Sequence, residues 1–473
     1  TTTIDLSSGN LIYMTQSAST TVSFANTSNG NVYIIRTKDD NTTTRTITWP
    51  TGIGWSGGSA PTLIQDNPRA ADAQVFLLVT RNMGETWYGK EVVRSDPQSI
   101  NLFAMGRSAV GQLGLNNVVA LSSPTQVGTA SNWYDIGGGR GAGNMEQQAA
   151  TKSDGSLWTW GDNFSGVLGL NSPASDDRSS PTQVGTDTTW TNIAKGGEIM
   201  AAAKSDGTFW AWGSQNYGQL GQNQGYPDST NVGRSSPVQV GTDTTWSKLS
   251  ASSEAVYAVK TNGTLWSWGR NFFGNLGHNQ GNPSPGYPGS KSSPTQIGTN
   301  TNWNQMLHCD VHATSATKTD GTLWAWGYGG LGALGKNDVV GYSSPTQVGS
   351  DTNWSRVFFL NNCQVASKTN GTLWSWGYNG SGRLGQNNLT QYSSPTQIGT
   401  DTTWTHGSLE GSWNGGGFCK KTDGTLWCWG LNSSGQLGLN SRTHYSSPVQ
   451  VTAYSDGWLK YGRFGGSANA IIK

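Results

Sequence analysis

A nine-residue phrase of alternating side chains recurs six times in this chain. In TDGTLWAWG at 319–327, an Asp-Gly pair precedes a run in which Leu and Ala alternate with two tryptophans. This pattern predicts a tight turn that leads into a β-strand. Because successive side chains of a strand point to opposite faces, the two tryptophans share one face. Both faces are apolar, so we expect cover on both sides. The other copies lie at 153–161, 205–213, 261–269, 369–377 and 422–430.

Three further landmarks recur seven times and define a repeat of about 50 to 58 residues. Each unit contains a G-x-LG element, then Ser-Ser-Pro, then a single tryptophan. The G-x-LG elements begin at Gly111, Gly166, Gly218, Gly274, Gly332, Gly382 and Gly435. The single tryptophans are Trp133, Trp190, Trp246, Trp303, Trp354, Trp404 and Trp458. The number of units therefore does not depend on the opening phrase.

The two ends of the repeat region complement each other. LFAMG at 102–106 stands where the other units have a sequence such as LWTWG, and it has no strand before it. SANAIIK at 467–473 stands where the other units have the strand that precedes the turn, and nothing follows it. A ring closed by pairing these two segments explains both observations. We therefore predict an all-β protein in which residues 95–473 form a seven-bladed β-propeller with a composite closing blade.

The order of the landmarks resembles the RCC1 repeat, named after the regulator of chromosome condensation. The matching pattern is G-x-LG, SSP-T-Q-V/I-G, W, and A-x-K-x-DG-x-L-W-x-W-G, over nearly 380 residues. The resemblance implies a propeller fold. It leaves function open, because propellers of this family include exchange factors, enzyme inhibitors and binding surfaces.

Each landmark has an expected physical role. The glycines of G-x-LG permit a positive φ or a close approach of neighbouring blades, and the proline starts a strand whose first residue need not donate a hydrogen bond. The tryptophans fill the space between blades. The small residues of MAAAK at 200–204 suit a narrow strand. We therefore expect such strands to be the innermost ones.

Residues 1–94 lack the repeat and are predicted to form a separate small β domain. Two alternating runs around Asn29-Gly30, and two more around 82–84, predict two β-hairpins. An antiparallel sandwich is the simplest arrangement. Trp49, Trp55 and Trp87 are expected to form its small core.

Part of this domain resembles a small β module of bacteriophage tail-fibre and other virion structural proteins. The resemblance covers residues 45–92 and rests on ITWP, WSGGSAPTL, VFLLVT and GETWYGKEV. It implies that residues 1–94 attach the protein to other virion subunits.

Composition and charge exclude several classes of function. The chain has 66 Gly and 23 Trp but only 12% charged residues, which is typical of a turn-rich β protein. Its net charge is +1 and no run of basic residues occurs, so we expect no nucleic-acid binding. No stretch approaches the roughly 18 to 20 apolar residues of a spanning helix, so no membrane insertion is expected. The four cysteines are expected to be packed or free thiols.

Motifs for catalysis are scarce. The sequence contains no GxSxG, P-loop or HExxH motif and no paired carboxylates. His308-Cys309-Asp310-Val311-His312 invites a metal interpretation, but two strand residues four positions apart lie about 13 Å from each other. We expect a solvated loop there. No metal, cofactor or catalytic residue is predicted.

Two non-repeating features are candidate binding sites. Glu146, Glu198 and Glu254 each lie six residues before the lysine that precedes a turn, so they are expected to form an acidic arc at one mouth of the channel. Such an arc either holds a cation, docks a basic partner or is simply solvated. The connections at 222–234 and 278–291 are also unusually long and polar, so they are either recognition loops or tolerated insertions. Their candidate contact residues are Tyr226, Asp228, Asn231, Arg234, His278, Asn282, Tyr287 and Lys291.

The phage-like module, the low charge and the polar loops lead to one main hypothesis. The protein is a non-enzymatic virion structural protein, assembled in the host cytoplasm, whose propeller binds a host-surface glycan or protein or neighbouring subunits. Fibre proteins are commonly trimeric, although a propeller needs no partner to close its edges. The alternative is a regulatory or inhibitory RCC1-like propeller that binds a soluble protein.

Overall fold

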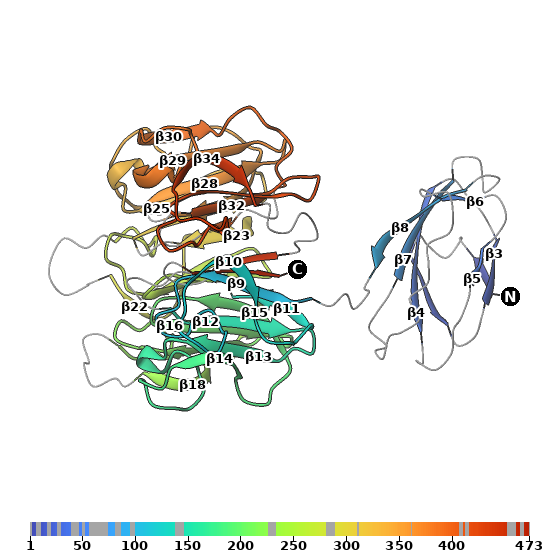
Figure 1. The fold of residues 1–473 in the computed structure, drawn as a ribbon, viewed down its shortest axis with the longest axis horizontal. Helices are drawn as coiled ribbons and strands as arrows, with labels where there is room; N and C mark the ends of the chain where they lie inside the picture. Colours follow the sequence, from blue (N-terminus) through green and yellow to red (C-terminus); the bar gives the residue numbers. More distant parts are fainter. Residues whose placement is uncertain are drawn as a thin grey trace. The chain divides into compact units, whose positions relative to one another are not determined.

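The computed structural model divides the chain into two compact units, Thr1–Gln98 and Ser99–Lys473 (Figure 1). This boundary lies four residues beyond the one expected from the sequence. In the first unit the structure describes the strands given below and Trp49. In the second it describes residues 100–137, 146–225, 233–280, 289–309, 312–360, 362–405, 410–411, 416–451, 460–463 and 468–472.

The first unit contains two sheets. One has the order β1 (Thr2–Asp5), β3 (Thr20–Ala25), β5 (Ile47–Thr48). The other has the order β2 (Leu11–Gln16), β4 (Gly30–Lys38), β7 (Gln74–Thr80), β8 (Trp87–Arg94), β6 (Ile53–Trp55). Parallel pairs such as β1 with β3 and β2 with β4 show that the purely antiparallel prediction is wrong.

The two predicted hairpins of this unit have different outcomes. β7 pairs with β8 in antiparallel register, which confirms the second one. The first is wrong, because β3, which precedes Asn29, and β4, which begins at Gly30, belong to different sheets. A turn signal predicts that the chain reverses, but it does not decide whether the two runs pair with each other. Trp49 is half-buried, and the side chains of Trp55 and Trp87 lie outside the described residues.

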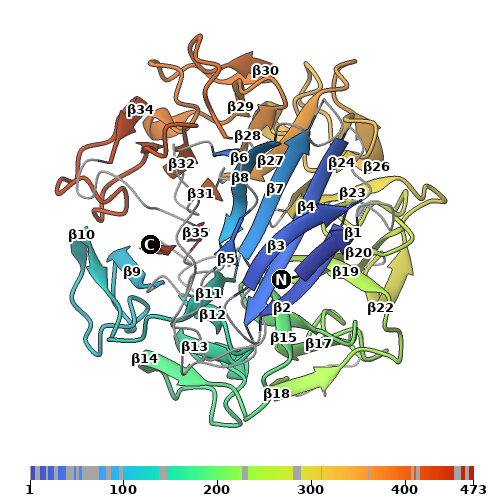
Figure 2. The same ribbon diagram turned by 90° about the vertical axis from the view of Figure 1, so that its right-hand side faces the viewer.

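The second unit is an all-β propeller in which six four-stranded sheets each consist of four consecutive strands (Figure 2). The first two are β11 (Trp133–Ile136) to β14 (Arg178–Gln183), with β12 (Gln148–Lys152) and β13 (Leu157–Gly161), and β15 (Trp190–Lys195) to β18 (Arg234–Gln239), with β16 (Ile199–Lys204) and β17 (Phe209–Gly213). The next two are β19 (Trp246–Ala251) to β22 (Lys291–Gln296), with β20 (Ala255–Lys260) and β21 (Leu265–Gly269), and β23 (Trp303–Cys309) to β26 (Tyr342–Gln347), with β24 (Ala313–Lys318) and β25 (Leu323–Gly327). The last two are β27 (Trp354–Phe359) to β30 (Tyr392–Gln397), with β28 (Cys363–Lys368) and β29 (Leu373–Gly377), and β31 (Glu410–Gly411) to β34 (Tyr445–Gln450), with β32 (Gly416–Lys420) and β33 (Leu426–Gly430).

A composite sheet closes the ring. It has the order β10 (Leu121–Gln126), β9 (Leu102–Gly106), β36 (Ala468–Ile472), β35 (Lys460–Arg463). β36 pairs with β9 in antiparallel register, from Ala468 opposite Gly106 to Ile472 opposite Leu102. The predicted closure by pairing of the two ends of the repeat region is therefore confirmed. With this sheet, the described part of the propeller contains seven four-stranded sheets.

The radial order of the strands differs from the prediction. The first strands of neighbouring sheets, such as β15 and β19 or β23 and β27, contact each other around the axis (Figure 2). The innermost strands therefore begin with the single tryptophans. The small-residue strands such as β16 come second and are almost wholly buried. Small side chains suit this position because both faces of the strand are covered by neighbouring sheets.

Tryptophans and glycines join adjacent sheets as the sequence predicts. The second tryptophan of each phrase is fully buried. In Trp326, for example, Nε1 donates to the backbone carbonyl of Asn275, in the G-x-LG element of the preceding unit, at 2.8 Å. A Cβ on Gly277 would lie 2.9 Å from that Nε1, so only glycine fits. At the composite sheet Met105 replaces the indole, and a Cβ on Gly438 would lie 2.5 Å from its Sδ.

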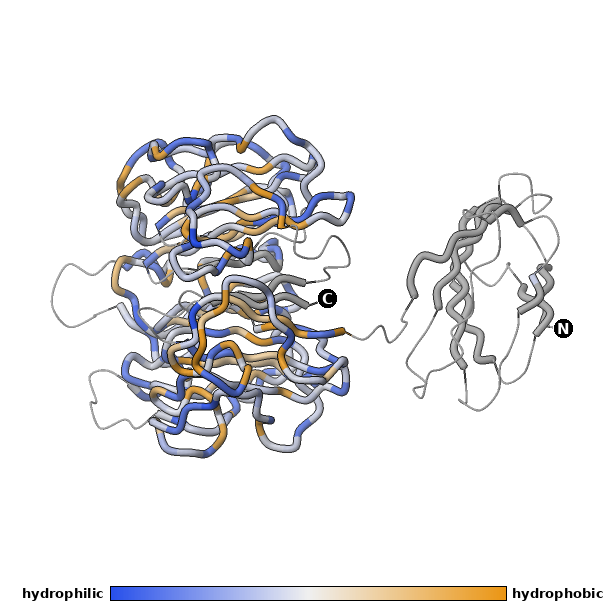
Figure 3. The backbone as a smooth tube through the Cα atoms, viewed as in Figure 1, coloured by the Kyte–Doolittle hydropathy of each residue, from blue (hydrophilic) through white to orange (hydrophobic). Residues whose placement is uncertain are grey.

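Hydrophobic stretches lie along the propeller strands, and hydrophilic ones lie on the peripheral turns (Figure 3). Cys363, Cys419 and Cys428 are buried thiols, as predicted. The helical segments of the described chain are three-residue turns at η2 (Phe164–Gly166), η3 (Gly330–Gly332) and η4 (Gly380–Gly382). Within these described residues, no helix has the length and apolar character needed to cross a membrane.

Candidate functional site

The propeller has two ends, which are named here by their connections. The loop face carries the connections from first to second strand and from third to fourth strand of each sheet. The turn face carries the Asp-Gly or Asn-Gly turns and the connections to the next sheet. Glu146, Glu198 and Glu254 precede second strands, and the long connections at 222–234 and 278–291 join third to fourth strands. The acidic residues and the long connections therefore share the loop face.

Glu146 is not a solvated member of an arc. It is 1% exposed and accepts hydrogen bonds from Arg107, at 3.1 Å, and from Gln112. Burial raises the pKa of Glu146 to about 7, although the nearby Arg107 charge acts in the opposite direction. Arg107 and Gln112 follow β9, so this carboxyl group joins the composite sheet to the next one.

Glu198 and Glu254 lie around a shared arginine. Glu254 forms an ion pair with Arg270, and the guanidinium lies 4.7 Å from the ring centroids of both Tyr217 and Phe272. Burial raises the pKa of Glu198, and the Glu254 charge raises it further. The three carboxyl groups are therefore partly or fully buried, and two of them, Glu146 and Glu254, form ion pairs with arginines.

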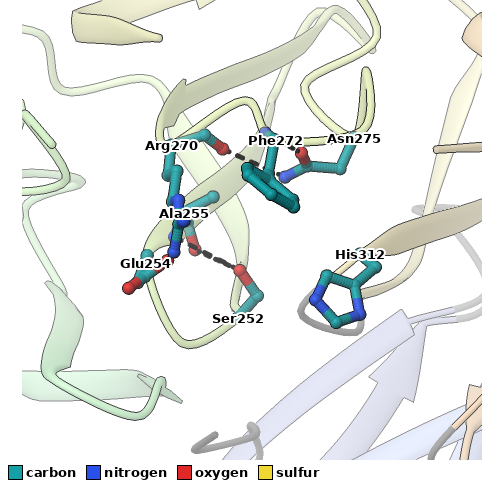
Figure 4. Close-up of a pocket in the computed structure, with 7 residues that line it drawn as sticks. All are labelled: Ser252, Glu254, Ala255, Arg270, Phe272, Asn275 and His312. Carbon is teal, nitrogen blue, oxygen red and sulfur yellow. Dashed lines mark hydrogen bonds and ion pairs between the residues drawn. The ribbon is translucent and has the colours of Figure 1, made fainter. Parts of the chain in front are cut away.

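A small pocket lies beside this ion pair (Figure 4). It is lined by Ser252, Glu254, Ala255, Arg270, Phe272, Asn275 and His312. His312 faces Glu254 and Arg270 across the pocket, and its ring lies 5.0 Å from that of Phe273. The pocket combines a carboxylate, a guanidinium and an aromatic wall, which suits one side chain of a partner better than an extended substrate.

The expectation of a solvated loop at 308–312 is wrong for the residues that the structure describes. His308 and Cys309 belong to β23, and His312 is half-buried against aromatic rings. Across the described chain, no group of three His, Cys, Asp or Glu side chains is placed to hold a metal ion.

Three of the eight candidate contact residues in the long connections lie within the described chain. Arg234 is exposed at the start of β18, and Lys291 is half-buried at the start of β22. His278 points inward, with Nε2 2.9 Å from the Ser267 hydroxyl, and burial lowers its pKa. His278 is therefore a packing residue. Tyr226, Asp228, Asn231, Asn282 and Tyr287 lie outside the described residues.

The sequence analysis missed an apolar set on the loop face. Of the eight described large apolar residues that are exposed, seven lie in connections between third and fourth strands, at 40% to 66% exposure. They are Val118, Val119, Phe164, Leu331, Val339, Val340 and Leu389. Several sit on rigid tips, because the Asn117 and Asp338 side chains accept hydrogen bonds from the backbones of Val119 and Val340, both at 3.0 Å. The shared seven-residue spacing before Ser-Ser-Pro was the available signal.

The turn face carries a second feature that the sequence analysis missed. The lysine before each turn lies between the single tryptophan and the first tryptophan of the phrase, which makes a repeated cation–π stack. Lys152, for example, lies 5.0 Å from the ring centroid of Trp133 and 3.6 Å from that of Trp158. The same arrangement occurs at Lys204, Lys260, Lys318, Lys368 and Lys421. The first tryptophans are half-buried, so they do not fill the space between sheets as the second ones do.

Comparisons with known proteins agree with this architecture. Residues 154–203, 206–259, 370–406 and 423–461 match the Regulator of chromosome condensation (RCC1) repeat. The RCC1 domain-containing protein RUG3, mitochondrial, of Arabidopsis thaliana is 27% identical over 288 residues, which cover 56% of this chain and 62% of RUG3. The E3 ubiquitin-protein ligase HERC2 of Homo sapiens is 24% identical over 249 residues, 52% of this chain but 5% of HERC2. The chain thus spans less than two thirds of either relative.

A solved structure has a similar fold. Prp20p from Saccharomyces cerevisiae superposes with a TM-score of 0.67 at 18% identity, over 79% of this chain and 91% of that one. At this identity the likeness shows the fold alone. These matches give no support to the phage-like interpretation of residues 45–92. The chain therefore carries RCC1 repeats and folds into an RCC1-like propeller.

Proposed function

We propose that this protein is a non-enzymatic, protein-binding propeller whose loop face docks a folded protein partner. This is the alternative raised from the sequence, and the comparisons favour it over the virion role. The structure of Prp20p is described together with its binding properties to Gsp1p and histones, so an RCC1-like propeller can act as a binding protein.

The observation that carries the proposal is the collection of exposed apolar side chains on one face. Apolar side chains scattered over a surface need no explanation, but a concentration on one face is typical of an interaction site. Rigid tips also lose little conformational entropy when a partner binds. The Arg270 pocket adds a held guanidinium next to aromatic rings, and residues of these types contribute most to protein interfaces.

The test uses the full chain as bait, with partners covalently cross-linked and identified by mass spectrometry. Replacing both Val339 and Val340 by Ser removes one apolar tip without touching the core. Thr186→Ala, at an exposed position on the turn face, is the control. We expect one stoichiometric partner, cross-linked near Lys336 and retained by the control but lost from the double variant. Equal retention by both variants would refute docking on the loop face.

The virion role stays a prediction that rests on the resemblance of residues 45–92. It would place the partner on the first unit and the protein on an extracellular particle. The test is to label virus particles with antibodies against residues 1–94. If no particle is labelled, the virion role is excluded, whereas labelled particles would support it.

A further inference from the structure

The cation–π stacks on the turn face include an ion pair in four of the six sheets. There, an aspartate from the connection that precedes the first strand places its carboxylate on the lysine Nζ. The pairs are Lys204 with Asp187, Lys260 with Asp243 and Lys421 with Asp401, each at 2.5 Å, and Lys368 with Asp351, at 2.7 Å. These four sheets show directly how a carboxylate binds to an ammonium group held between two indoles.

Two sheets lack this aspartate although their backbone is the same. The connection has equal length in all six sheets, and the φ of the glycine two residues before the aspartate position differs little, as in Gly128 at φ +60° and Gly185 at φ +58°. By this register Ala130 and Asn300 stand where the other sheets have Asp. Within the described residues, Lys152 and Lys318 form no ion pair, and burial lowers the pKa of both amines.

The two positions that lack aspartate differ in the size of their residue and in the exposure of the nearby lysine. Asn300 has nearly the volume of Asp, and Lys318 is only 6% exposed. Ala130 is smaller by a carboxyl group, and Lys152 is half-buried. Lys152 is therefore the more exposed of the two lysines, and the residue at its aspartate position is the smaller one.

We propose that Lys152, Trp133, Trp158 and the space left by Ala130 form a binding site for the carboxylate of an Asp or Glu side chain on a protein partner. The incoming oxygen would occupy the position that Asp187 occupies on Lys204, without displacing the indoles. The Asp154 carboxylate is close enough to Lys152 to act on its charge, and the Ile100 N–H donates to the carbonyl of Ser131, next to Ala130. One ammonium group binds a free carboxylate weakly, so the site acts as one contact within a larger interface.

The site is on the turn face, and the proposed docking surface is on the loop face. The two proposals therefore fail independently, because the Val339 and Val340 substitutions leave this site intact.

The test measures binding of a fluorescently labelled hexaglutamate peptide to the full chain by anisotropy at low salt. Ala130→Asp supplies the missing carboxylate internally, and Lys152→Gln removes the ammonium. We expect each to weaken binding about tenfold or more, as loss of a charged hydrogen bond implies. Asn300→Asp and Lys204→Gln are matched controls and are expected to have no effect. Equal affinity of wild type and Ala130→Asp would overturn the proposal, even if Lys152→Gln were poorly folded.

A second readout identifies the occupant. Amine-reactive labelling followed by mass spectrometry is expected to show that the peptide protects Lys152 but not Lys204. Protection by inorganic phosphate and not by acetate would overturn the assignment to a carboxylate. Asp96 lies four residues before Ile100 in the sequence. If Asp96→Asn raised the labelling of Lys152 in the absence of peptide, the occupant would be this chain itself, and the proposal of a partner would be refuted.

Discussion

Replacing Trp326 by Ala should reduce the free energy of unfolding of the propeller by about 3 to 5 kcal/mol. Trp326 is 0% exposed, its ring centroid lies 6.1 Å from that of Trp303, and it fills the space against the preceding sheet. The loss of its hydrogen bond adds little, because the Asn275 carbonyl still accepts from the Tyr257 hydroxyl at 2.9 Å. The expected cost is therefore that of the cavity and of the lost apolar contacts.

Trp324 is the matched control, two residues away on the same strand. It is half-buried, and its Nε1 bonds to the Thr322 hydroxyl at 2.9 Å. Trp324→Ala should cost about 1 to 2 kcal/mol, from partial burial and the lost cation–π contact with Lys318. Urea unfolding followed by circular dichroism measures both. If the two variants lost equal stability, the assignment of separate roles to the two tryptophans would be wrong.

Three further predictions concern single positions. Gly277→Ala should destabilise more than Gly298→Ala, because both have positive φ but only the first would place a Cβ against an indole, 2.9 Å from Nε1; thermal unfolding of the pair isolates that clash. The hydrogen bond from Lys260 lowers the pKa of Asp243 to about 2, so this pair stabilises the fold above pH 4 and loses its contribution as the pH falls toward 2; the stability difference between wild type and Asp243→Asn should shrink over that window. Burial raises the pKa of Glu146 to about 7, so its ionisation destabilises the fold increasingly as the pH rises from 4.5 to 7; Glu146→Gln should gain stability relative to wild type at pH 8 compared with pH 5, and a pH-independent difference would show that the carboxyl group titrates normally.

Much of the propeller could be predicted from the sequence. The strands, the turns and the closure of the ring follow from patterns within a few residues and from the complementary ends LFAMG and SANAIIK. The glycine and tryptophan contacts between sheets also follow, because each repeats at a fixed position. The prediction failed for the innermost strands and for the connection at Asn29-Gly30, because the choice of pairing partner depends on the whole fold.

The candidate sites could be predicted only in part. Aligning the repeats located Glu146, Glu198 and Glu254, but not the arginines that neutralise two of them, because Arg107 lies 39 residues from Glu146. The polar sequence around His278 predicts a contact residue, yet its ring bonds inward to Ser267. The seven-residue spacing before Ser-Ser-Pro indicates that the connections with exposed valines are alike, but it does not predict that the valines are exposed.

The phrase KTDGTLWAWG separates what the sequence determines from what the tertiary structure decides. The sequence by itself determined that the phrase is a turn and a strand and that its lysine and tryptophans recur, because these properties depend on neighbours along the chain. Only the tertiary structure decided that the lysine lies between two indoles from different strands, and that Ala130 leaves one such lysine without a carboxylate. Those contacts join residues about 20 positions apart, and the physical reason is that charge pairing depends on distance in space.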